Sequence, residues 1–252
     1  MTDTIRYERT GHIARLVLNN PGQHNALGQE QLAAIQEHLE AVRADAQVRV
    51  LIITGWGEKT FCAGASLQQL GSGNLSGDQF QETTDLIAHL PIPTICAING
   101  NVYGGGAELA LSCDFRIGVA GSKLRVPAAA IGLCYPISGI NRFVERLGVT
   151  TAKRMLLAAE EMDAETLLHL GFLDHLVQPA ALDKVAENLA LQIAKLAPLS
   201  VRAMKLVIQQ AAAGNINREE ANALSRQCLD SDDLQEGFAA KREKRQPRFQ
   251  GK

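Results

Sequence analysis

Apolar positions follow two different spacings along the chain, and each spacing predicts one kind of element. Short runs that alternate with polar residues, or that are apolar throughout, are typical of strands. They occur at residues 4–9, 12–18, 48–54, 94–98, 113–119 and 173–177. Apolar residues that recur every three or four positions predict helices. These occur at residues 28–44, 78–89, 107–111, 140–146, 151–158, 163–170, 182–197, 201–212 and 215–229.

The order of these elements indicates an α/β fold. Strands and helices alternate through residues 1–120, whereas the chain beyond about residue 140 is mainly helical. Thr10-Gly11 separates the first two strands and predicts a hairpin. We expect Asp78 to cap the helix that follows it. The chain has no internal repeat of about 20–50 residues, which is the period that would indicate a solenoid.

Composition narrows the functional classes. The chain has 252 residues, of which 46% are apolar, and its net charge of −2 gives no global sign of nucleic-acid binding. Five cysteines without a CxxC pair, and histidines without a zinc spacing, predict neither a disulfide framework nor a metal site. No apolar stretch of about 18 residues is present, and the first residues lack a signal-peptide region. We therefore expect a cytoplasmic protein without metal, membrane or nucleic-acid partners.

A glycine triplet is the first candidate for chemistry. Gly104-Gly105-Gly106 lies between the strand at 94–98 and a helix that carries Glu108 in its first turn. A helix N-terminus presents unpaired N–H groups and favours negative charge, so this turn could hold a developing oxyanion, with Glu108 as acid or base. A tight packing turn, with a carboxylate that merely stabilises the helix dipole, accounts for these residues about equally well.

A second glycine turn strengthens the functional interpretation. Ala63-Gly64-Ala65 also follows a buried strand and leads toward a helix. An oxyanion hole needs two N–H donors that converge on one oxygen, and two such turns could supply one donor each. The alternative is an ordinary turn that begins a helix.

Several segments in a fixed order resemble the crotonase superfamily, the enoyl-CoA hydratase/isomerase proteins. They are residues 20–27, 61–67, 98–109, 113–117, 163–174 and 244–249. The resemblance implies a crotonase-like (ClpP/crotonase) α/β spiral of ββα units, with a helical C-terminal region that builds trimers. It implies a division into a catalytic, acyl-CoA-binding core (1–195) and a helical region for oligomerisation and completion of the CoA site (196–252). It also implies a homotrimer or hexamer that acts on an acyl-CoA thioester. Coenzyme A is then part of the substrate, and no separate cofactor is expected.

The same resemblance implies roles for individual residues. The backbone N–H groups of Ala65 and Gly105 would hold the thioester oxygen, and Glu108 falls on the first catalytic glutamate of hydratases. Lys244 or a neighbouring base would meet a CoA phosphate, on the same or an adjacent subunit. The residues implied to bind CoA are Gln23, His24, Ala26, Ala63, Ala65, Leu67, Lys244 and Phe249.

One difference from the pattern of typical hydratases leaves the type of reaction open. Ala128 follows Pro127 where typical hydratases carry their second glutamate. Tyr135 and Ser138 are the candidate auxiliary groups nearby, although a packing role for Tyr135 is the stronger interpretation from sequence. Hydration of a 2-enoyl thioester ranks first. Double-bond isomerisation, other atypical acyl-CoA chemistry and a thioester-binding paralogue with little catalysis stay open, as do the acyl chain and the stereochemistry.

Overall fold

Two sheets and ten α-helices make up residues 4–252, which are the residues that the computed structural model describes. The strands are β1 (Ile5–Thr10), β2 (Ile13–Leu18), β3 (Val50–Gly55), β4 (Thr60–Cys62), β5 (Thr94–Ile98), β6 (Asn101–Tyr103), β7 (Phe115–Val119), β8 (Lys123–Arg125), β9 (Met162–Asp163) and β10 (His175–Val177). The helices are α1 (Gln29–Ala44), α2 (Leu67–Gly71), α3 (Gly77–Ala88), α4 (Gly105–Ser112), α5 (Ile137–Leu156), α6 (Ala164–His169), α7 (Leu182–Ala194), α8 (Pro198–Ala212), α9 (Arg218–Leu229) and α10 (Asp232–Glu243).

The chain builds the two sheets turn by turn. Each turn adds one strand to the six-stranded sheet (β1-β2-β3-β5-β7-β10), one strand to the four-stranded sheet (β4-β6-β8-β9), and then helical structure. The successive units are β3-β4 with α2 and α3, β5-β6 with α4, and β7-β8 with α5. The strands β3, β5 and β7 pair in parallel, as do β4, β6 and β8. This arrangement is the predicted spiral of ββα units.

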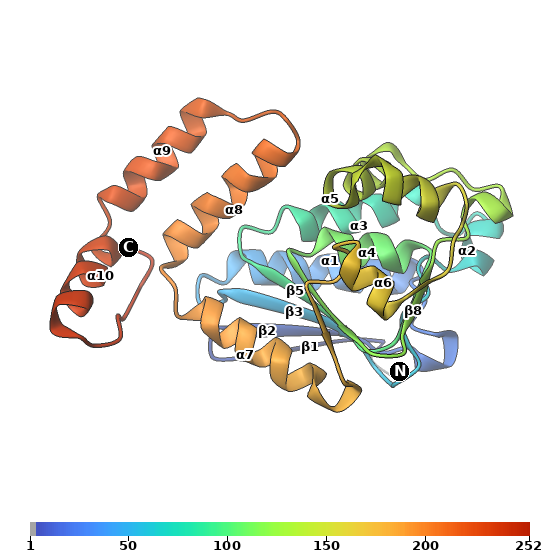
Figure 1. The fold of residues 1–252 in the computed structure, drawn as a ribbon, viewed down its shortest axis with the longest axis horizontal. Coiled ribbons are helices and arrows are strands. Elements are labelled where there is room, and N and C mark those ends of the chain that lie inside the picture. Colours follow the sequence, from blue (N-terminus) through green and yellow to red (C-terminus); the bar gives the residue numbers. More distant parts are fainter. Residues whose placement is uncertain (1–3) are drawn as a thin grey trace.

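The central strands of the large sheet, β3 and β5, are covered on both faces, which explains their apolar runs. Side chains alternate across a strand. Leu51 and Ile53 accordingly join the core beneath α1, whereas Val50 and Ile52 pack on the face covered by α7. Figure 1 shows α7 on one side of the sheet and α1, α3 and α4 on the other. Strands of a parallel sheet that is covered on both faces are apolar along their whole length, without alternation.

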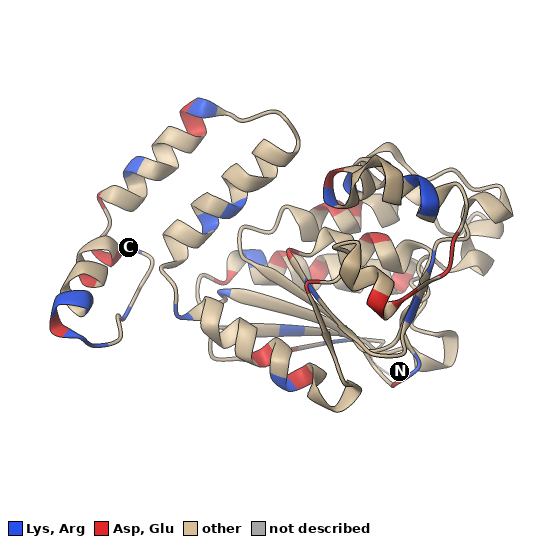
Figure 2. Ribbon diagram, viewed as in Figure 1, with Lys and Arg blue, Asp and Glu red and all other residues tan. Residues whose placement is uncertain are grey.

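The helices α8, α9 and α10 extend away from the sheets (Figure 1). Hydrogen bonds tie this region to the core: Lys205 Nζ donates to Asp114 Oδ2 at 2.6 Å, Gln209 Nε2 donates to the Ala88 carbonyl at 2.7 Å, and Arg49 Nη2 donates to the Phe249 carbonyl at 2.7 Å. Charges of both signs lie on α9 and α10 (Figure 2). The division at residue 196 and the trimerisation role of these helices stay predictions.

Several predicted boundaries are wrong. Ser76, not Asp78, caps α3, because its hydroxyl accepts the Gln79 N–H, and Asp78 lies within the first turn. The helices predicted at 140–146 and 151–158 are confirmed as the two halves of α5, because the backbone leaves the helical conformation at Gly148 between them (φ 75°, ψ 163°). The helix predicted to end at residue 197 ends at Ala194.

Other elements have no counterpart in the sequence prediction. The strands β6, β8 and β9 are two or three residues long, too short for a period to be visible. The helix α10 buries only Asp233 and Ala240, so its sequence lacks an apolar stripe. Within residues 4–252, no helix combines the length and apolar character needed to cross a membrane.

Candidate active site

The turns at residues 63–66 and 104–105 meet at the start of α4. Leu27 N–H donates to the Gly64 carbonyl at 2.8 Å, and Ser66 N–H donates to the Leu27 carbonyl at 2.8 Å. Neighbouring N–H groups of an extended segment point to opposite sides, so the Ala65 N–H faces away from Leu27. A side-chain carbon on Gly64 would collide with the Gly105 nitrogen, so the two turns are in direct contact.

Positive backbone angles make this contact possible. Gly64 has φ +80° and Gly104 has φ +50°, a region that residues with a side chain seldom occupy. Gly105 is then the first residue of α4, where an N–H has no acceptor within the helix. Neither the Ala65 N–H nor the Gly105 N–H donates a hydrogen bond to any group in residues 4–252. Two N–H groups without an acceptor in the described residues therefore lie in adjoining turns.

Glu108 lies one turn further along α4 and is 1% exposed. Its Oε1 accepts hydrogen bonds from Thr84 Oγ1 and from Arg142 Nη1, both at 3.1 Å. Burial raises the pKa of the Glu108 carboxyl, and the Arg142 charge and the Thr84 hydrogen bond oppose that rise. Desolvation dominates, because the Glu108 side chain is almost fully buried while Arg142 shares its charge with Asp85, whose Oδ1 lies 2.5 Å from Nη2.

The N-terminus of α5 packs directly against this carboxylate. A side-chain carbon on Gly139 would lie 2.9 Å from Glu108 Oε2, so a larger residue would push the carboxylate aside. The same helix carries Arg142 and Phe143 on its buried face. Thr84, Asp85 and Arg142 are not predicted as site residues from the sequence. An arginine beside Phe143 on the apolar face of a helix is the signal that could have pointed to Arg142.

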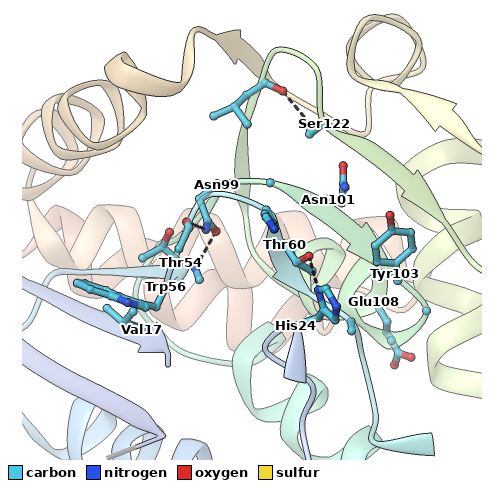
Figure 3. A pocket seen from close by; sticks show the side chains of 18 of the residues that line it. Val17, His24, Thr54, Trp56, Thr60, Asn99, Asn101, Tyr103, Glu108 and Ser122 are labelled. Carbon is cyan, nitrogen blue, oxygen red and sulfur yellow. Dashed lines mark hydrogen bonds between the residues drawn. The ribbon is translucent and has the colours of Figure 1, made fainter. Parts of the chain in front are cut away.

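A cavity of about 1940 Å³ connects these features and extends past Trp56 to Asp183 on α7. Figure 3 shows Glu108, Tyr103, His24 and Thr60 around one end of it. Of the residues predicted to bind CoA, those that line the cavity are Gln23, His24, Ala63, Ala65 and Leu67. No group of His, Cys, Asp and Glu side chains in residues 4–252 is arranged to hold a metal ion.

Three residues predicted to bind CoA do not line this cavity. Ala26 lies beside it in the 20–27 loop, where its N–H donates to the Gln23 carbonyl at 3.0 Å. Lys244 ends α10, and Phe249 packs near Gly237 of the same helix. The neighbouring Arg245 pairs with Glu236 at 2.6 Å and lowers the pKa of that carboxyl to about 2. The positive charge of the C-terminal tail is therefore partly neutralised by an acidic residue of α10.

The segment from residue 127 to the start of α5 differs from the pattern of typical hydratases. Ala128 and Tyr135 line the cavity, whereas Ser138 does not. Tyr135 packs edge-on against Phe143, with ring centroids 5.8 Å apart, as the packing interpretation predicts. The hydroxyl oxygens of Tyr135 and Ser138 are nevertheless both buried without a hydrogen-bond partner in the described part of the chain.

Replacing Arg142 with glutamine is expected to raise the pKa of Glu108 further, because the closest positive charge is lost. Any rate that needs the Glu108 carboxylate should then reach its plateau about one to two pH units higher than in the wild type. Urea unfolding should show a loss of about 3–5 kcal/mol, since Glu108 and Asp85 are left without their partner. The Arg142→Lys variant, which keeps the charge, is the control. An unshifted profile in Arg142→Gln would show that Arg142 does not set the ionisation of Glu108.

Comparison with known proteins gives one consistent result. The family model for enoyl-CoA hydratase/isomerase matches residues 8–252. A (E)-benzylidenesuccinyl-CoA hydratase from Thauera aromatica is 33% identical, over 98% of this chain and 99% of its own length. A crotonyl-CoA hydratase from Syntrophomonas wolfei is also 33% identical, over 98% of both chains. The crystal structure of an enoyl-CoA hydratase from Bacillus anthracis has a TM-score of 0.92 at 30% identity, and it covers 99% of this chain and 100% of that one.

Proposed function

Because the chain belongs to the enoyl-CoA hydratase/isomerase family of enzymes, we propose that it adds water to the double bond of a 2-enoyl-CoA thioester. One observation carries this proposal. Glu108, whose carboxylate is buried, lines the same cavity as the turns that bear the free Ala65 and Gly105 N–H groups. A base and two converging donors are the parts that enolate chemistry needs.

In the proposed reaction, the N–H groups of Ala65 and Gly105 hold the thioester oxygen. The Glu108 carboxylate takes a proton from water as the water oxygen bonds to C3. The electrons of the C2=C3 double bond move toward the thioester oxygen, which becomes an enolate oxygen held by both donors. Glu108 then returns its proton to C2, the carbonyl re-forms, and the product has gained one water. A raised pKa suits a group that must both take and give a proton near neutral pH.

We assign binding of the CoA moiety to the cavity beside Ala63 and Leu67, with Gln23 and His24 at its wall. Lys244 and Phe249 would then contact CoA from a neighbouring copy, in a homotrimer or a hexamer. The exposed apolar side chains on the C-terminal helices support such an assembly; they are Met204, Ile208, Leu229 and Phe238. The reaction needs no further cofactor, and we place the enzyme in the cytoplasm.

Isomerisation is the second candidate, and Ala128 is the observation that favours it. A single carboxylate can remove a proton at C2 of a 3-enoyl thioester and return it at C4, which moves the double bond without a second acid. At position 128, a methyl group stands in the cavity wall and cannot titrate.

Mass spectrometry of a thioester panel tests the choice. We expect 2-enoyl-CoA substrates of several chain lengths to gain the mass of one water, and 3-enoyl-CoA substrates to react more slowly. Double-bond migration without a mass change, in the absence of any hydration, would instead identify an isomerase. Tight binding without turnover across the whole panel would identify a binding paralogue and contradict both proposals.

A further inference from the structure

The Tyr135 hydroxyl is a polar group that the proposed reaction has not yet used. Its oxygen is buried and has no hydrogen-bond partner in residues 4–252. Burying a hydroxyl without a partner destabilises a folded chain, and native proteins seldom leave one so. The Phe143 ring contacts the ring of Tyr135 and provides no acceptor for the hydroxyl. A packing role therefore explains the aromatic ring but does not explain why the residue is tyrosine rather than phenylalanine.

The position of Tyr135 relates it to Glu108. Both residues line the same cavity. Tyr135 precedes α5 and lies four residues before Gly139, the residue that packs against the Glu108 carboxylate. Burial, and then the negative charge of Glu108, raise the pKa of the Tyr135 phenol. Near neutral pH, Tyr135 therefore stays protonated and can serve as a hydrogen-bond donor rather than as a base.

The wall around Tyr135 offers few other polar groups. From residue 127 to residue 138, the residues that line the cavity are Pro127, Ala128, Ile131, Leu133, Cys134, Tyr135 and Pro136. The Cys134 thiol already points to a backbone carbonyl, that of Tyr135, at 3.5 Å. Among the residues of this segment that line the cavity, Tyr135 is thus the one that carries a strong side-chain donor, and its hydroxyl is buried without a partner.

We propose that the Tyr135 hydroxyl donates a hydrogen bond to the oxygen that is added at C3, first as the attacking water and then as the 3-hydroxyl group of the product. This inference rests on the proposed hydration. Glu108 takes one proton of that water and returns it to C2, and the other proton stays on the new C3–OH group. Tyr135 keeps its own proton throughout and fixes the oxygen on the Glu108 side of the double bond. One carboxylate and one phenol then share the work for which typical hydratases use two carboxylates.

The test compares two reactions of the Tyr135→Phe variant. We expect kcat for 2-enoyl-CoA hydration to fall about 10- to 100-fold, the effect of losing one donor to a reacting oxygen, while KM changes by less than about threefold. The second reaction is exchange of the C2 protons of a saturated acyl-CoA of the same length, in deuterium oxide. This exchange needs Glu108 and the N–H donors but no oxygen at C3, so its rate should be unchanged in Tyr135→Phe.

Tyr7→Phe is the matched control. Tyr7 stacks on His38, with ring centroids 5.2 Å apart, and lies outside the cavity, so both reactions should proceed at wild-type rates. Wild-type hydration by Tyr135→Phe would overturn the inference. An equal loss of hydration and exchange would also overturn it, because the ring would then act only through packing. A wild-type enzyme that hydrates no panel member would instead refute the proposed function itself.

Discussion

Replacing Glu108 with glutamine is expected to lower kcat for hydration about 10³-fold or more, while the acyl-CoA still binds. Glutamine preserves the shape of the side chain but cannot accept the proton from water or return it to C2, and general acid–base groups contribute about 10²- to 10⁴-fold. The Ala65 and Gly105 donors that would hold the thioester oxygen belong to the backbone and stay in place. Steady-state kinetics would give kcat, and calorimetric titration with a saturated acyl-CoA would give the affinity.

Glu145→Gln is the control for this substitution. Glu145 lies exposed on α5, so the same change there should leave kcat unchanged. If Glu108→Gln hydrated the substrate at the wild-type rate, Glu108 would not be the base. If it lost binding and turnover together, the defect would lie in folding of the site rather than in proton transfer.

The second large effect is expected from Gly64→Ala. The added methyl group would collide with the Gly105 nitrogen and would have to occupy φ +80°. Relief of that collision separates the Ala65 and Gly105 N–H groups. We expect kcat/KM to fall about 10²- to 10³-fold, the typical effect of losing one oxyanion donor.

Gly11→Ala is the control that separates the effect of backbone strain from the effect on the oxyanion donors. Gly11 has φ +59° but nothing within 4 Å of an added side-chain carbon, so it shares the backbone strain without the collision. Both variants should lose about 1–2 kcal/mol of unfolding free energy from the left-handed backbone. Only Gly64→Ala should lose activity. Equal kcat/KM values for the two variants would show that the contact between the two turns is not needed for catalysis.

The sequence predicted most of the large sheet, because β3 and β5 are buried on both faces and are apolar runs, and β2 alternates between buried and half-buried positions. Residues 94–98 form a strand in both the prediction and the structure. The two glycine turns were identified for a similar reason: a strand, a glycine and a helix start leave a local pattern. The small sheet was not predicted, because its strands are two or three residues long and gain their stability from neighbours distant in the chain.

The environment of Glu108 could not be predicted from the sequence. Arg142 lies 34 residues further along the chain and Thr84 lies 24 residues earlier, so only the packing of three helices brings them to one carboxylate. Glu108 itself was recognised from its place in the glycine motif. The roles of Lys244 and Phe249 in binding CoA stay predictions.

In the proposed reaction, one carboxylate on one face of the substrate serves both proton steps. Hydration of a 2-enoyl-CoA in deuterium oxide measures this directly, because NMR of the product locates the deuterium at C2 relative to the new hydroxyl group. We predict a single deuterium on the same face as the hydroxyl group, because Glu108 delivers to C2 the proton that it took from the attacking water. Deuterium on the opposite face, or on both faces equally, would contradict the account, since the proton would then come from another donor.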